Sequence, residues 1–148
     1  MYKYHGKREF AGFYVQQAVE RCGSWIRERR PDCITAVPLN RRKLRQRGYN
    51  QAMLVAKGIG RALKIPVDGG LLVRSRYTAP QKELNSAQRL KNLQKAFGSG
   101  KSVRKYKSVL LVDDIYTTGS TMKICSEILK ANGVNQVWIL SLCIGSDD

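Results

Sequence analysis

A single stretch, residues 109–121, constrains the fold of this chain more than any other part of it. It opens with four consecutive apolar residues, Val109-Leu110-Leu111-Val112, a pattern typical of a strand buried on both faces of a parallel sheet. The strand runs directly into Asp113 and Asp114, and a turn of small hydroxylated residues at 117–121 comes next. Open α/β folds bind their ligands at the carboxyl edge of the sheet. The stretch therefore predicts an α/β domain with two carboxylates at that edge.

The turn at residues 117–121 has the features of a phosphate-binding helix start. The first backbone N–H groups of a helix and the positive end of its dipole attract anions, and Gly119 has no side chain to hold a phosphate away. Asp113 and Asp114 suit a partner that offers hydroxyl groups or shares a Mg²⁺ ion with them. A ribose phosphate satisfies both conditions. The alternative is a receiver-like or other doubly wound domain, which has acidic residues at strand ends but no hydroxyl-rich turn directly after them.

Helical and strand patterns alternate along the whole chain. Apolar residues at three- and four-residue spacing predict helices, and short apolar runs predict strands. Polar residues 74–86 contain Pro80 and are predicted to form a mobile loop. The alternation predicts a mainly parallel twisted sheet flanked by helices, with right-handed crossovers, in one domain over residues 1–148. In chain order we expect a helix at 9–29, a strand at 33–37, a helix at 50–63, a strand at 71–73, a helix at 87–97, a strand at 109–112, a helix at 121–131 and a strand at 137–143.

The charge of the chain predicts an anionic partner. Its 148 residues include 27 lysines and arginines against 11 aspartates and glutamates, a formal net charge of +16. Residues 1–108 hold 25 of the cations and 6 of the anions, whereas residues 109–148 hold 2 and 5, so the net charges are +19 and −3. The densest basic run, residues 41–47, has five cations in seven positions. We interpret this pattern as a basic surface that faces an acidic site.

Cysteine and histidine usage excludes several classes of site. Cys22, Cys33, Cys125 and Cys143 are far apart and form no CxxC motif, so we expect neither a zinc site nor a redox pair. His5 is the sole histidine and lies in a basic terminal stretch that we expect to be mobile, so a Ser-His-Asp or Cys-His triad has no imidazole. The chain contains no Walker A sequence.

No targeting or membrane segment is evident in the sequence. No apolar run reaches the roughly 20 residues that are needed to span a bilayer. The first residues lack the apolar stretch of a secretory signal. We therefore expect a soluble cytoplasmic protein without membrane insertion.

Residues 109–121 resemble the phosphoribosyl pyrophosphate (PRPP) signature of type I phosphoribosyltransferases. Nearly the whole chain is similar to the ComF family of phosphoribosyltransferase-like competence proteins, in particular to ComFC-like members. Many ComF proteins have a four-cysteine zinc module ahead of this region, and it is missing here, so we expect either a naturally short relative or a fragment. The resemblance implies a type I phosphoribosyltransferase fold with little or no hood. The segments that carry it are Ala36-Val37-Pro38-Leu39, Arg47-Gly48-Tyr49-Asn50-Gln51-Ala52, and the residues Gln81, Leu84, Arg89, Asn92 and Phe97.

The same resemblance implies a role for each part of the site. Asp113 and Asp114 would accept hydrogen bonds from the ribose hydroxyls, and Arg41 and Arg42 would grip the departing pyrophosphate; these four are the expected catalytic residues. A lid at residues 74–92 would exclude water from the activated sugar. The 5′-phosphate loop is assigned Thr117, Thr118, Gly119, Ser120 and Thr121, the pyrophosphate loop Val37, Pro38, Leu39, Asn40 and Arg41, and the lid Gln81, Lys82 and Arg89.

The activity implied by the resemblance is phosphoribosyl transfer from PRPP to an unidentified nitrogenous acceptor, with release of pyrophosphate. Mg²⁺ would arrive with the ligand and be shared with Asp113 or Asp114. The pathway would be DNA uptake in natural competence or nucleotide metabolism. The alternative is a protein that binds PRPP as a sensor, or binds single-stranded DNA, without catalysing transfer. No segment resembles a base-binding hood, so the acceptor and the oligomeric state stay open.

The basic run contains more cations than one small ligand requires. Lys43, Arg45 and Arg47 are not needed for pyrophosphate, and basic surfaces with aromatic rings bind single-stranded nucleic acid. Tyr49 follows these cations directly, so its ring is a candidate for stacking on bases. Single-stranded DNA and the DNA-uptake machinery are the further partners under this interpretation. The simpler alternative, a solvated basic face, stays open beside it.

Overall fold

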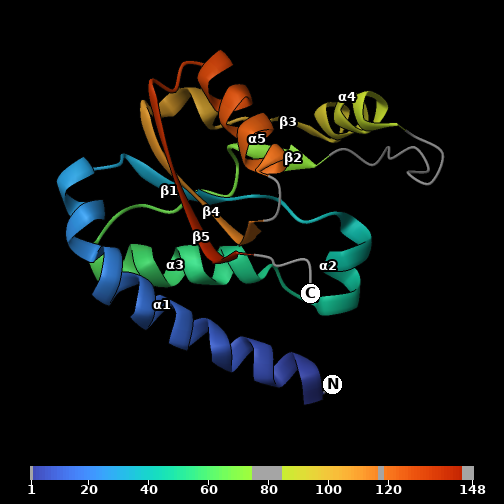
Figure 1. The fold of residues 1–148 in the computed structure, drawn as a ribbon. Coiled ribbons are helices and arrows are strands. Elements are labelled where there is room, and N and C mark those ends of the chain that lie inside the picture. The colour runs from blue at the N-terminus through green and yellow to red at the C-terminus, as the bar shows by residue number, and fades with distance from the viewer. Residues whose placement is uncertain (1, 75–84, 117–118, 145–148) are drawn as a thin grey trace.

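The computed structural model describes residues 2–74, 85–116 and 119–144 of the chain (Figure 1). Every helix and strand predicted from the sequence is present. In chain order the elements are helix α1 (Tyr2–Arg29), strand β1 (Cys33–Ala36), helix α2 (Arg41–Arg47), helix α3 (Gln51–Leu63), strand β2 (Leu72–Arg74), helix α4 (Ser86–Ala96), strand β3 (Phe97–Ser99), 3-10 helix η2 (Val103–Lys105), strand β4 (Ser108–Tyr116), helix α5 (Ser120–Ala131) and strand β5 (Gln136–Ile144).

The main sheet is parallel, as predicted, with the strand order β1-β4-β5. On the other side of β1, the segment around Val67 adds one parallel bridge. There the Ile34 N–H donates to the Pro66 carbonyl at 2.9 Å, and the Ile34 carbonyl accepts from the Asp68 N–H at 3.1 Å. Strands β2 and β3 form a separate antiparallel pair.

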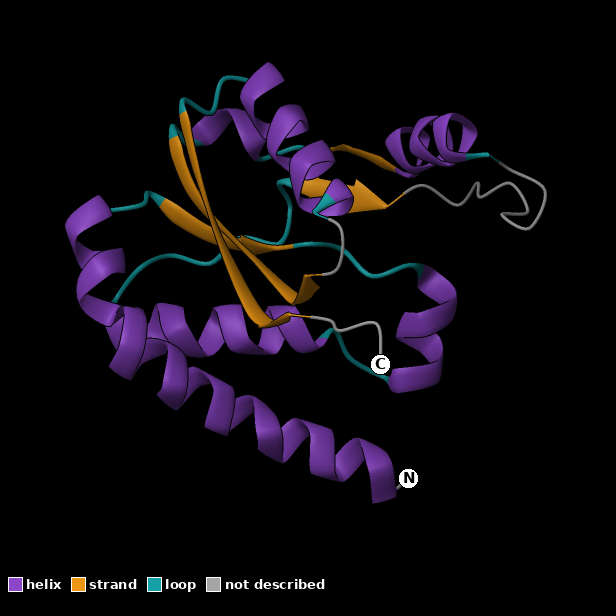
Figure 2. Cartoon of the chain, viewed as in Figure 1, coloured by secondary structure: helices purple, strands orange, loops and turns teal. Residues whose placement is uncertain are grey.

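Strand β4 is the central strand, and its side chains alternate between two apolar layers. Leu110 and Val112 pack with α1 and α3, whereas Val109 and Leu111 pack with α5 and the β2-β3 pair. All four side chains are at most 1% exposed. Figures 1 and 2 show the resulting three layers, with α1 and α3 on one side of the sheet and α5, β2 and β3 on the other. The unbroken apolar run at 109–112 exists because both faces of this strand are covered.

Helix α1 is longer than the sequence predicted. The apolar spacing indicates a helix from residue 9, yet α1 begins at Tyr2, so the backbone at His5 is helical. The helix ends at Arg29, ahead of Pro31 as predicted, and Arg30 takes a left-handed conformation with φ of 49°. None of the helices within the described ranges is both long and apolar enough to cross a membrane.

Helix α2 was not predicted, because no apolar face repeats along it, although its residues are good helix formers. Its one apolar side chain, Leu44, is 41% exposed, so no buried face repeats along it. Both ends are capped by hydrogen bonds instead. The Asn40 Oδ1 accepts from the Lys43 N–H at 2.8 Å, and the Gly48 N–H donates to the Leu44 carbonyl at 2.7 Å. Gly48 has φ of 81°, a left-handed conformation that glycine adopts at little cost.

The Asp68 carboxylate joins two segments on the α5 side of the sheet. Its Oδ1 accepts from the Gly70 N–H at 2.7 Å, and its Oδ2 accepts from the Tyr106 hydroxyl at 2.7 Å. Partial burial raises the pKa of Asp68, but the hydrogen bonds from Tyr106 and Gly70 outweigh it and hold the pKa below its usual value. The same bond, with a smaller effect of burial, raises the pKa of Tyr106 to about 12. The pair is therefore an ionised acid with a neutral phenol over the neutral pH range.

We expect Tyr106→Phe to lower the free energy of unfolding by about 1 kcal/mol at neutral pH, because it removes one hydrogen bond to a charged acceptor. The lowered pKa of Asp68 means that this stability is present above the unfolded pKa of about 4 and is lost as pH falls through the folded value. Urea unfolding at a series of pH values should show the difference from wild type shrinking in acid. The control is Tyr14→Phe. If Tyr106→Phe lowers the free energy of unfolding equally at all pH values, the hydrogen bond from Tyr106 to ionised Asp68 does not account for the loss.

Candidate functional site

The first part of the site lies at the carboxyl end of β4. The strand continues through both acidic residues to Tyr116, so the carboxylates belong to the strand itself rather than to the turn after it. Asp113 is half-buried and pairs with Ser141 of the neighbouring strand β5. The backbone of Asp114 follows in β4, and its side chain lies outside the described part of the structure. Asp113 therefore lies in the C-terminal part of β4, and its role at the site stays a prediction.

The second part is the start of helix α5. Gly119 is the N-cap residue, with φ of 80°, and no side-chain cap hydrogen bond is formed there in the described structure. Its carbonyl accepts from the Lys123 N–H at 2.9 Å, which closes the first turn. Ser120 and Thr121 are half-buried in that turn. Thr117 and Thr118, the other two residues of the predicted 5′-phosphate loop, lie outside the described residues.

The third part is the loop after β1, which is held to β4 and α3 by hydrogen bonds. The Val37 N–H donates to the Val112 carbonyl at 2.9 Å. The Asn50 Nδ2 donates to the Val37 carbonyl at 3.1 Å, while the Asn50 Oδ1 accepts from the Met53 N–H at 3.3 Å and caps α3. One asparagine side chain therefore fixes the predicted pyrophosphate loop and starts the following helix. In that loop Val37 is buried and Pro38, Leu39 and Asn40 are half-buried.

The cations predicted to bind phosphates lie on α2, directly after this loop. Arg41 and Arg42 form its exposed first turn, Lys43 and Arg45 are also exposed, and Arg47 is half-buried. Figure 1 shows α2 beyond the end of β1, separate from the sheet and from the helices that cover it. The exposed cations can therefore reach a ligand without displacing a packed side chain.

Tyr49 corrects one prediction made from the sequence. Its position beside the basic run suggested a ring free to stack on bases. Its side chain is 6% exposed, because the chain turns inward after Gly48 towards α3. A ring buried to this extent offers no face to a nucleobase, so the prediction of stacking by Tyr49 is wrong.

The lid residues are described only in part. Gln81 and Lys82 lie outside the described residues. Arg89 belongs to α4, although its side chain is not described. That helix begins with a capping box in which the Asn85 Oδ1 accepts from the Gln88 N–H at 2.8 Å and the Gln88 Oε1 accepts from the Asn85 N–H at 3.0 Å.

Arg74, the last residue of β2, is a cation at the site that the sequence analysis missed. Its guanidinium lies 4.5 Å from the ring centre of Phe97, and its Nε is enclosed without a hydrogen-bond partner in the described structure. Burial lowers the pKa of Arg74. Burial also raises the pKa of Cys125 to about 12; Asp113 adds to this rise and Arg74 opposes it, so both charges lie near that thiol. Arg74 stands alone at the start of a polar loop, so nothing in the sequence around it indicates that its side chain is enclosed.

A metal ion shared with a phosphate ligand would find a carboxylate of Asp113 here. Mg²⁺ takes about six oxygen ligands and is commonly bound through one or two carboxylates plus substrate phosphates. In the part of the chain that the structure describes, no three side chains of His, Cys, Asp or Glu are grouped as metal ligands. The Asp113 carboxylate lies in the C-terminal part of β4, three residues before the strand ends at Tyr116.

A model of the phosphoribosyl transferase domain family matches residues 49–147, which include β4, α5 and α4. The chain belongs to this family. Among solved structures, glutamine PRPP amidotransferase from Bacillus subtilis has a TM-score of 0.56 at 21% identity, with 93% of this chain and 26% of that chain covered. Purine phosphoribosyltransferase from Pyrococcus horikoshii has a TM-score of 0.54 at 19% identity, with 89% and 73% covered. These similarities confirm the predicted type I phosphoribosyltransferase fold.

Curated relatives of this phosphoribosyl transferase domain carry the names expected from the ComF resemblance. Competence protein F of Haemophilus influenzae is 37% identical over 114 residues, which are 76% of this chain and 50% of that protein. DNA utilization protein YhgH of Escherichia coli is 36% identical over 113 residues, or 76% and 49%. Competence protein ComFC of Bacillus subtilis is 26% identical over 100 residues, or 68% and 39%. The chain thus spans at most half the length of these relatives, and the resemblance to them is confirmed.

We expect Asn50→Asp to lower the free energy of unfolding by about 1 kcal/mol. The aspartate keeps the oxygen that caps α3, but it has no N–H for the Val37 carbonyl and repels it. Asn40→Asp is the matched control, because the Asn40 side chain makes only a capping hydrogen bond, which an aspartate oxygen can also accept. We expect the free energy of unfolding to change by no more than about 0.5 kcal/mol. Urea unfolding of both variants gives the comparison. Equal stability of Asn50→Asp and wild type would show that Asn50 does not fix the loop.

Proposed function

We propose that the chain binds PRPP and transfers its phosphoribosyl group to a nitrogenous acceptor, in a pathway of DNA uptake or nucleotide metabolism. One observation carries this proposal: in a phosphoribosyl transferase domain, a half-buried Asp113 in the C-terminal part of the central strand precedes a helix that opens on left-handed Gly119. In this proposal the Asp113 carboxylate accepts hydrogen bonds from ribose hydroxyls, and the start of α5, a few residues further along the chain, binds a phosphate. The names of the curated relatives support the pathway.

Each part of the site then has a role toward the ligand. The backbone of Gly119, Ser120 and Thr121 suits the 5′-phosphate, because a helix start has N–H groups without intrahelical partners and the positive end of the dipole. Asp113 accepts hydrogen bonds from ribose hydroxyls, and Asp114 is assigned the same role. Thr117 and Thr118 complete the phosphate loop in this proposal.

The reaction breaks the bond between ribose C1 and the pyrophosphate oxygen and forms a bond between C1 and a nitrogen of the acceptor. Negative charge develops on the departing pyrophosphate, and fixed cations stabilise it. Arg41 and Arg42 are assigned to this group, and the capped α2 and the Asn50–Val37 bond hold the backbone that carries them. Mg²⁺ bound with the ligand supplies further neutralisation of the phosphate oxygens. Gln81, Lys82 and Arg89 of the lid exclude water, which would otherwise hydrolyse PRPP.

A second candidate function, binding of single-stranded DNA, is supported by α2. Its exposed cations Arg41, Arg42, Lys43 and Arg45 have no carboxylate within ion-pair distance among the described residues. Lys43 and Arg45 add two positive charges to the two arginines that are already assigned to the pyrophosphate. They fit a polyanion, whose binding releases counterions.

Calorimetric titration tests the first proposal. We expect PRPP to bind in the presence of Mg²⁺, to bind more weakly after chelation, and to lose at least about tenfold in affinity in Asp113→Asn with Asp114→Asn, because charged hydrogen-bond acceptors are removed. Glu20→Gln, on the exposed side of α1, is the control. Equal or tighter binding by the double variant would defeat the assignment.

Pyrophosphate release then separates a transferase from a sensor. The chain is incubated with PRPP, Mg²⁺ and each of a panel of free bases and amines. Release that depends on the acceptor supports transfer. Binding of PRPP without release for any acceptor favours the sensor.

Fluorescence anisotropy with labelled single-stranded DNA tests the second candidate. The logarithm of the affinity should fall linearly with the logarithm of salt concentration, by about 0.7 for each phosphate contact. Lys43→Ala with Arg45→Ala should lower this slope by about 1.4, while Lys57→Ala with Arg61→Ala on α3 serves as the matched control. PRPP affinity should stay unchanged in the first pair. If no complex forms at low salt, or if the two double variants show the same slope, α2 is not the DNA-binding site.

A further inference from the structure

Two arginines of the described chain are stacked on aromatic rings, and only one of them has partners for its N–H groups. The guanidinium carbon of Arg29 lies 4.5 Å from the ring centre of Trp25. That of Arg74 lies 4.5 Å from the ring centre of Phe97. The Arg29 Nη1 donates to the Trp25 carbonyl at 3.4 Å and to the Glu28 carboxylate at 3.5 Å. The Arg74 guanidinium has neither a hydrogen bond nor an ion pair with any described residue.

Arg74 is a partly buried cation without a counter-ion in the described structure. Its Nε is enclosed, and the Phe97 ring on which it stacks is 6% exposed. Taking a cation out of water is costly unless an anion pairs with it, and burial lowers the pKa of Arg74 accordingly. Burial also raises the pKa of the nearby Cys125 to about 12, so this thiol is neutral at neutral pH and offers no negative charge. The position therefore suits an anion that the described part of the chain does not supply.

The N–H groups at the edge of the Arg74 guanidinium are available to a ligand. Stacking on Phe97 uses the face of the guanidinium, whereas its five N–H groups lie in its plane. Of the three side-chain nitrogens, Nε alone is enclosed without a partner, and the residue as a whole is half-buried. The two Nη groups therefore remain accessible. A guanidinium in this state can bind two oxygens of one anion through parallel N–H···O bonds.

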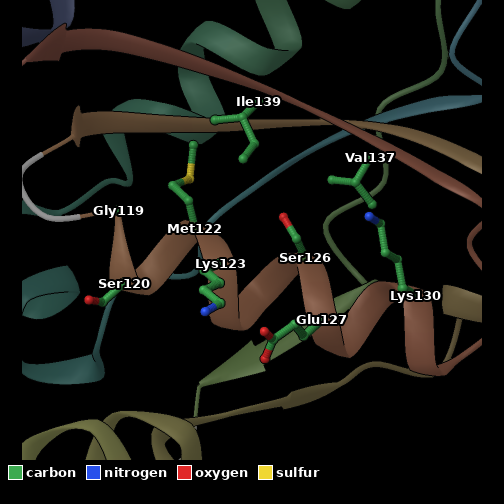
Figure 3. A pocket seen from close by; sticks show the side chains of 9 residues that line it. All are labelled: Gly119, Ser120, Met122, Lys123, Ser126, Glu127, Lys130, Val137 and Ile139. Carbon is green, nitrogen blue, oxygen red and sulfur yellow. The ribbon is translucent and has the colours of Figure 1, made fainter.

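Arg74 lies in the same layer of the molecule as Asp113 and α5. Asp113 follows Leu111 by two positions, so it faces the side of β4 on which Leu111 packs with α5 and the β2-β3 pair. The charges of Asp113 and Arg74 both act on the Cys125 thiol of α5. Figure 3 shows the groove on one side of α5, where Met122 points towards β5, while the β2-β3 pair passes on the other side. Arg74 is thus close to the carboxylate of the candidate site but does not line that groove.

We propose that Arg74 binds a phosphoryl group of the ligand at this site through the N–H groups at the edge of its guanidinium. The inference rests on the proposed function, because PRPP is the anion that it invokes. PRPP carries a 5′-phosphate at one end of the ribose and a pyrophosphate at the other, and the oxygens of both groups match a planar guanidinium. The assignment adds a cation from β2 to the helix start of α5 and the arginines of α2.

Calorimetric titration of Arg74→Met tests this assignment. Methionine keeps an unbranched apolar stem against Phe97 but has neither the charge nor the donors. With Mg²⁺ present, PRPP should bind at least about tenfold more weakly than to wild type, because hydrogen bonds from a charged group are lost. Arg74→Lys keeps the charge and should lose less. Separate titrations with ribose 5-phosphate and with inorganic pyrophosphate identify the group, because only the ligand that contains it should lose affinity.

Arg29→Met is the matched control, because it removes an arginine that is stacked at the same distance on α1. Its affinity for PRPP should equal that of wild type. Without ligand, the melting temperature of Arg74→Met should fall less than that of Arg29→Met, since Arg29 loses paired donors and Arg74 loses an unpaired, partly buried charge. Titrations run well below both melting temperatures ensure that a loss of affinity does not come from unfolding.

The affinity of the two methionine variants for PRPP decides the outcome. If wild type binds PRPP and Arg74→Met binds it as tightly as Arg29→Met does, Arg74 does not contact the ligand and this inference alone is overturned. A lower melting temperature of Arg74→Met with unchanged affinity would assign it a structural role instead. If wild type does not bind PRPP, the proposed function is refuted together with the inference.

Discussion

The burial of β4 on both faces is the constraint on which the rest of this structure depends. Val109, Leu110, Leu111 and Val112 are at most 1% exposed and alternate between the α1-α3 layer and the α5 layer. Each such side chain contributes roughly 2 kcal/mol of burial free energy, and no polar side chain is tolerated along this run. Polarity begins at Asp113, which is half-buried. The length of the buried run therefore sets where the carboxylates and the start of α5 lie.

Elements whose apolar residues repeat with a helical or strand period could be predicted from the sequence, and elements without such a repeat could not. The runs at β1, β4 and β5 and the helical spacing of α3 and α5 reflect burial, and all five were predicted. Helix α2 buries no side chain and exists because Asn40 and Gly48 cap its ends. Strand β3 is three residues long, too short for any period to show. Both were missed for the same reason.

The site residues could likewise be placed only where an element with a repeating apolar pattern carries them. Asp113 and the start of α5 could be placed because a buried strand and an amphipathic helix position them. Tyr49 could not, since neighbouring cations in the sequence do not reveal whether a ring is buried. Arg74 was missed because its enclosure comes from Phe97 of β3, twenty-three residues further along the chain, through the β2-β3 pairing. Contacts between distant segments leave no local pattern in the sequence.

Both halves of the candidate site depend on β4. One half follows it directly, through Asp113 and the helix that starts at Gly119. The other half, the loop that leads to Arg41 and Arg42, is attached through the bond from the Val37 N–H to the Val112 carbonyl and through Asn50. Since α2 has no buried side chain of its own, these hydrogen bonds and its caps hold the backbone of its arginines in place. The spacing between the carboxylate and the cations is therefore set by the packing of one strand, while the cations themselves stay exposed to a ligand.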